Sequence, residues 1–67
     1  MTKQLLRDRA GRLLGWIETD SRGKQYLRDK AGRLLGWYDP ALGSTYDRAG
    51  RLVGRSNILL TLLPVRP

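Results

Sequence analysis

The 67-residue chain contains no cysteine, no histidine and no phenylalanine. Without cysteine it can form neither a disulfide framework nor a thiolate metal site. Without histidine, the usual zinc sites and the Ser-His and Cys-His nucleophilic pairs are excluded. Acidic residues are also few, with 6 Asp and Glu against 13 Lys and Arg, which gives a net charge of +7. The composition predicts a protein that is not an enzyme, with no catalytic residues, no metal site and no cofactor.

Long hydrophobic runs are also missing. The longest apolar-rich stretch, 58–65, is interrupted by Thr61 and Pro64 and falls far short of the roughly 20 residues of a membrane-spanning helix. The first residues carry no apolar segment of signal-peptide length. We therefore expect no membrane span and a cytoplasmic location. A chain this short forms one domain, 1–67, and without staples often gains stability by oligomerising, so we expect a homo-oligomer, with another protein as a further candidate partner.

An internal repeat organises the chain. The segment Leu6–Trp16 recurs as Leu27–Trp37 with ten of eleven positions identical, and more degenerately as Tyr46–Arg55. Natural duplication and engineering both explain such near-identity, and the irregular linkers favour duplication. The copies extend to repeats at about 4–23, 24–43 and 44–55.

Each repeat contains an Asp-x-x-Gly kernel followed by a basic residue. Aspartate at the first turn position can accept backbone N–H bonds, and glycine at the fourth tolerates positive φ. The kernel recurs between the first two copies as Asp20–Gly23, and a looser version spans Asp39–Gly43. The chain therefore has five turns at regular intervals, which indicates short antiparallel strands. The structural turn residues are Asp8, Gly11, Asp20, Gly23, Asp29, Gly32, Asp47 and Gly50.

The predicted fold is all-β: a six-stranded antiparallel meander of three repeated hairpins with a short C-terminal helix, completed by oligomerisation. A helix over 12–17 is the alternative for one strand, but Gly15 and the flanking turns leave too few residues for it. The pair Ser56-Asn57 predicts an N-cap and a helix at about 57–63, ended by Pro64, with a final strand as the alternative. The expected strands are 4–7, 12–18, 24–28, 33–38, 44–46 and 51–55.

Strand alternation places Trp16 on one face of the sheet and Ile17 on the other, so neither face is purely polar. Both faces then need cover, either by curling into a small barrel with the helix at one end or by pairing with copies through a face or an edge. Glycine recurs at equivalent strand positions 15, 36 and 54. This regularity predicts a shared geometric need, such as a bend or a close backbone approach.

Charge gathers at one end of the meander, where the first, third and fifth turns meet. Eight basic residues against three aspartates give this rim a net charge of +5, whereas the opposite rim sums to zero. The rim predicts a site for nucleic acid or another polyanion, with solvated turn tips as the alternative. Its candidate residues are Arg7, Arg9, Arg12, Arg28, Lys30, Arg33, Arg48 and Arg51. The equivalent Trp16 and Trp37 are either core or subunit interface, or a stacking platform for bases or sugar rings.

The segment Tyr46–Leu52 resembles the YD repeat of the RHS family, whose kernel is Tyr-Asp-x-x-Gly-Arg-Leu, and 6–13 and 27–34 are similar. Small stand-alone beta-flower proteins also look similar. The resemblance implies β-hairpin repeats and informs the fold rather than the function. The sequence as a whole favours a small non-enzymatic, self-associating β-repeat interaction module, with polyanion binding at the basic rim as the alternative.

Overall fold

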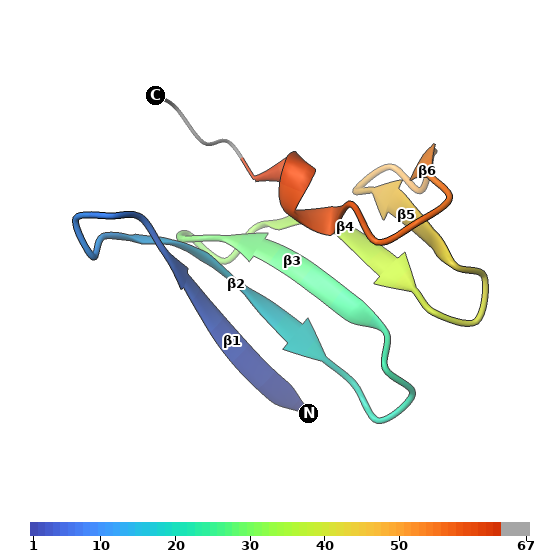
Figure 1. The fold of residues 1–67 in the computed structure, drawn as a ribbon, viewed down its shortest axis with the longest axis horizontal. Coiled ribbons are helices and arrows are strands. Elements are labelled where there is room, and N and C mark those ends of the chain that lie inside the picture. The colour runs from blue at the N-terminus through green and yellow to red at the C-terminus, as the bar shows by residue number, and fades with distance from the viewer. Residues whose placement is uncertain (64–67) are drawn as a thin grey trace.

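The computed structural model describes residues 1–63, and six strands in them form one antiparallel sheet in the order β1-β2-β3-β4-β5-β6 (Figure 1). The all-β meander predicted from the sequence is confirmed. The strands are β1 (Thr2–Arg7), β2 (Leu13–Thr19), β3 (Gln25–Asp29), β4 (Leu34–Asp39), β5 (Ser44–Asp47) and β6 (Leu52–Gly54).

The hairpins β1–β2, β3–β4 and β5–β6 share one irregularity. In each of them the pairing register shifts close to the connecting turn, between Leu6 and Arg7, between Leu27 and Arg28, and between Thr45 and Tyr46. The pairings β2–β3 and β4–β5 run without a shift. The sequence repeat is therefore a bulged hairpin.

The sheet is open. Within residues 1–63, β1 pairs only with β2 and β6 only with β5. The barrel considered from the sequence is therefore wrong for the described part of the chain. A meander of six short strands keeps its two edges apart, and each edge presents unpaired backbone groups.

The predicted C-terminal helix is a single 3₁₀ turn, η1 (Leu59–Leu62). Its N-cap is Ile58, which makes no side-chain cap bond. The side-chain Oδ1 of Asn57 accepts only a long 3.4 Å bond from the Leu59 N–H. The expected Ser-Asn cap pair therefore does not start an α-helix, and four residues are typical of a 3₁₀ segment. The final strand considered as the alternative is wrong, and Pro64 lies outside the described residues. No helix within residues 1–63 is long and apolar enough to cross a membrane.

The core lies between η1 and one face of the sheet, where η1 packs on β4 and β5 (Figure 1). Only three hydrophobic residues among those described are buried: Ile17, Leu27 and Leu59. Partly buried side chains pack around them, namely Leu6, Leu35, Tyr38, Leu62 and Leu63.

The strand glycines let backbone and η1 approach this face. A Cβ on Gly15 would collide with the carbonyl oxygen of Arg28, and one on Gly36 would collide with the Tyr46 carbonyl and with Leu62. A Cβ on Gly54 would lie 2.6 Å from the Ile58 Cδ1. The shared geometric need predicted from the glycine spacing is a close approach: to backbone at Gly15, to backbone and a side chain at Gly36, and to a side chain at Gly54.

Replacing Gly36 tests this constraint. We expect Gly36→Ala to lower the free energy of unfolding by about 2 kcal/mol, because the added methyl group meets backbone that cannot move without breaking strand pairing. Urea unfolding followed by circular dichroism measures the change. The control is Gly11→Asn, since Gly11 has φ +82° and no atom lies within 4 Å of the position that a Cβ would take there, and asparagine tolerates positive φ. Equal losses in both variants would contradict the close-approach argument.

Candidate functional site

Aspartates build the turns at the basic rim. The Oδ1 of Asp29 accepts the N–H groups of Ala31 and Arg33, both at 2.9 Å, and its Oδ2 accepts Arg33 Nε at 2.8 Å. The Gly32 N–H donates to the Asp29 carbonyl at 2.9 Å. Asp8 and Asp47 repeat the arrangement with the residues two and four positions on. One carboxylate thus holds both the turn and an arginine.

These contacts lower the pKa of the turn aspartates Asp8, Asp29 and Asp47. The largest cause in each is the backbone N–H bond from the arginine four residues on, and the guanidinium adds to it. Both effects stabilise the charged carboxylate. The turns therefore work with ionised aspartates, which leaves these groups engaged in structure rather than free as acids or bases.

Six of the eight rim cations lie in the turns and fall into two kinds. The turn arginines Arg12, Arg33 and Arg51 form ion pairs with the turn aspartates, yet their side chains stay 76–81% exposed. The tip cations are exposed at the outermost turn positions, and no ion pair involves them within residues 1–63. The tip cations are Arg9, Lys30 and Arg48.

The two remaining predicted rim residues lie on the strands rather than in the turns. Arg7 and Arg28 each donate to the carbonyl of a turn glycine, Gly11 at 3.0 Å and Gly32 at 3.1 Å. Arg28 also pairs with Glu18 at 3.0 Å. The eight predicted cations thus all belong to the same end of the sheet, and within residues 1–63 the tip cations and Arg7 form no ion pair with a carboxylate.

Trp16 and Trp37 lie on the face of the sheet opposite Ile17 and Leu27. Both are half-buried. We call this side the aromatic face, because the register also places Tyr26 beside Trp37 on the neighbouring strand. The rings of Trp37 and Tyr46 stack with centroids 5.9 Å apart and planes at 25°.

Cations gather on the aromatic face as well. The Lys3 Nζ lies 4.3 Å from the centroid of the Trp16 ring. The Lys24 Nζ lies 5.3 Å from the ring centroid of Tyr26 and 5.5 Å from that of Trp37. Such placements are favourable cation–π contacts. Neither lysine was a predicted site residue. Counting strand positions outward from the turns would have put both on the tryptophan side.

Glu18 is the acidic residue that links Trp16 and Arg28 on the aromatic face. It accepts the Trp16 indole N–H and the Arg28 Nε, each at 3.0 Å. Its pKa is lowered, chiefly by the bond from Trp16 and then by that from Arg28. The charge of Glu18 is therefore compensated within the sheet, and the surrounding field stays positive.

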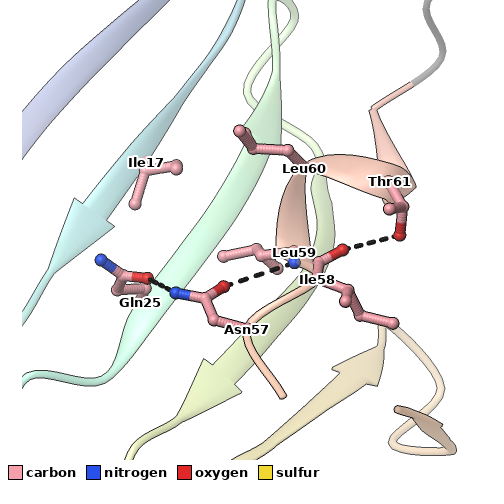
Figure 2. Close-up of a pocket in the computed structure, with 7 residues that line it drawn as sticks. All are labelled: Ile17, Gln25, Asn57, Ile58, Leu59, Leu60 and Thr61. Carbon is pink, nitrogen blue, oxygen red and sulfur yellow. Dashed lines mark hydrogen bonds between the residues drawn. The ribbon is translucent and has the colours of Figure 1, made fainter.

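A second surface lies on the other face, beside η1. Ile17, Leu59 and Leu60 line a shallow groove between β2 and η1 (Figure 2). Its polar end is fixed by Asn57, whose side-chain N–H donates to Gln25 Oε1 at 2.9 Å. Leu60 remains 56% exposed. The groove is an apolar surface that residues 1–63 cover only in part.

Comparison of the chain with protein-family models, with curated proteins and with solved structures found no match. The resemblance to YD repeats therefore stays a prediction. Within residues 1–63 no three carboxylates come together as a metal-binding group. The candidate sites are therefore the basic rim with the adjoining aromatic face, and the groove beside η1.

Acid should destabilise the fold through the turn aspartates and Glu18. Because their folded-state pKa values are lowered, the unfolded state binds more protons at acid pH. Their stabilisation is therefore present above their ordinary pKa values and is lost as pH falls through the lowered ones, below about pH 4. Chemical unfolding between neutral and strongly acid pH should show this loss. Asp29→Asn should flatten the acid limb and Ser21→Asn should not; an unchanged slope in the first variant would contradict the assignment.

Proposed function

We propose that this protein is a non-enzymatic, self-associating β-repeat module and that the partner of its apolar groove is a second copy of the chain. The observation that carries the proposal is the size of the core: three buried hydrophobic residues among residues 1–63. Small scaffolds with so little core, and without disulfides or metals, gain stability by association.

The groove supports a two-fold arrangement. Leu60 projects from the same surface that Ile17 and Leu59 line (Figure 2). The protruding Leu60 and the groove therefore belong to one self-complementary patch. A symmetric dimer uses such a patch twice, with each copy giving Leu60 to the other.

A charge in the groove should separate the copies. We expect Leu60→Asp to weaken self-association by about tenfold or more, because an unpaired carboxylate would be buried between them. Light scattering coupled to size-exclusion chromatography, over a concentration series, measures the change. The matched control is Leu42→Asp, since Leu42 is 64% exposed in the turn between β4 and β5. A wild-type chain that stays monomeric throughout the series would overturn the proposal.

The basic rim supports a second function, the binding of a polyanion. The observation behind it is the row of tip cations at one end of the sheet, none of them ion-paired within residues 1–63. The turns of adjacent hairpins lie two strands apart, about 10 Å. Cations in such a row attract a polyanion by releasing its counterions, so the affinity falls steeply with salt.

Charge reversal at the tips tests this second function. We expect Lys30→Glu with Arg48→Glu to weaken binding to heparin and to a mixed-sequence oligonucleotide by about tenfold or more at 50–100 mM salt, roughly the range where such binding is strong. The control is Arg22→Glu with Arg55→Glu, which makes the same charge change away from the rim. Fluorescence anisotropy gives the affinities. Equal losses in the two double variants would remove the rim from the mechanism and leave only net charge.

A further inference from the structure

Each tryptophan lies over the turn of the next hairpin. A Cβ placed on Gly32 would lie 3.7 Å from Trp16 Cη2, and one on Gly50 would lie 3.9 Å from Trp37 Cη2. Gly11, in the first turn, has nothing within 4 Å of that position, because β1 is an edge strand of the sheet within residues 1–63. The indole rings therefore extend along the aromatic face towards the basic rim at two equivalent places.

This arrangement makes two copies of one unit, an indole beside a cationic turn. Trp16 lies next to the turn that carries Lys30 and Arg33. Trp37 lies next to the turn that carries Arg48 and Arg51. The two turns are two strands apart, about 10 Å. We call each pairing an indole–tip unit.

The surroundings of the units favour an anion with aromatic groups. Lys3 and Lys24 reach over the indole rings, and Glu18 is compensated by Arg28 and the Trp16 N–H. A purely acidic peptide or polysaccharide would use the cations but leave the rings without a partner. A base with its phosphate uses both, because bases stack on aromatic side chains while phosphates pair with basic ones.

We propose that the two indole–tip units bind single-stranded nucleic acid, with one base on Trp16, another on Trp37 and the linking phosphates against the tip cations. The proposal depends on the polyanion-binding function and narrows it. Duplex nucleic acid fits less well, because its base faces are hidden in the stack and only its backbone can reach the rim. Lys3 and Lys24 leave the rings as bases arrive, and their ammonium groups turn to the phosphates.

The test compares three labelled probes at one salt concentration: a mixed-sequence single strand of about 12 nucleotides, the matching blunt duplex, and heparin. We expect the single strand to bind about tenfold or more tightly than the duplex, and it alone to quench the tryptophan fluorescence. This comparison uses the unaltered chain, so it does not depend on whether a variant folds.

Variants then assign the contact. Trp37→Leu should weaken single-strand binding by about tenfold and leave heparin binding unchanged, since the tip cations remain. Tyr38→Leu is the matched control, because Tyr38 is the adjacent aromatic residue on the opposite face. Thermal melts check that both variants are folded.

The outcomes separate this inference from the function on which it depends. Single-strand preference with quenching, lost in Trp37→Leu only, supports the indole–tip units. Equal binding of single strand, duplex and heparin with no effect of Trp37→Leu overturns stacking but leaves a polyanion-binding rim. Absence of binding to all three probes overturns the polyanion function and the inference together.

Discussion

The carboxylate of the turn aspartate sets the geometry on which the sheet depends. In the Asp29 turn it takes two backbone N–H groups and the Arg33 Nε, while the Asp29 N–H donates to the Arg33 carbonyl at 2.9 Å. These bonds close the hairpin and fix which residues pair beyond it, including the register shift next to the turn. Because three turns repeat the pattern, the three hairpins place equivalent residues at the same distance from their turns.

The same carboxylates redistribute the charge of the rim. Each turn arginine is held beside an aspartate, whereas the tip cations lie outside the hydrogen-bonded turn and form no ion pair within residues 1–63. A tip residue such as Lys30 has no part in closing the hairpin. Its charge can therefore act on a ligand at little cost to the stability of the fold. Removing the Asp29 carboxylate would instead change both the closure of the turn and the charge of the rim.

Much of the architecture follows from local sequence rules. The Asp-x-x-Gly spacing was sufficient to predict the turns, the number of strands and the end of the sheet where the basic residues gather. Strand alternation was sufficient to place Trp16 opposite Ile17. It could not decide which face η1 covers, since both faces carry apolar residues and the choice is made by contacts far apart in the chain. Gly36 and Gly54 mark the face that η1 covers, because only a face with glycines lets Leu62 and Ile58 approach so closely.

The indole–tip units show the limit of such rules. Alternation relates Trp16 to its own strand, but its contact with Gly32 crosses to the next hairpin and depends on the twist and spacing of the sheet. Strand alternation keeps the two proposed functions apart: the groove with Leu60 lies on the face of Ile17, and the tryptophans lie on the other. A second copy in the groove would leave both indole–tip units open. The two associations also differ in physical origin, since apolar burial is little weakened by moderate salt while phosphate contacts are. The two proposals together therefore predict that salt dissociates a nucleic acid from the rim while the copies remain together.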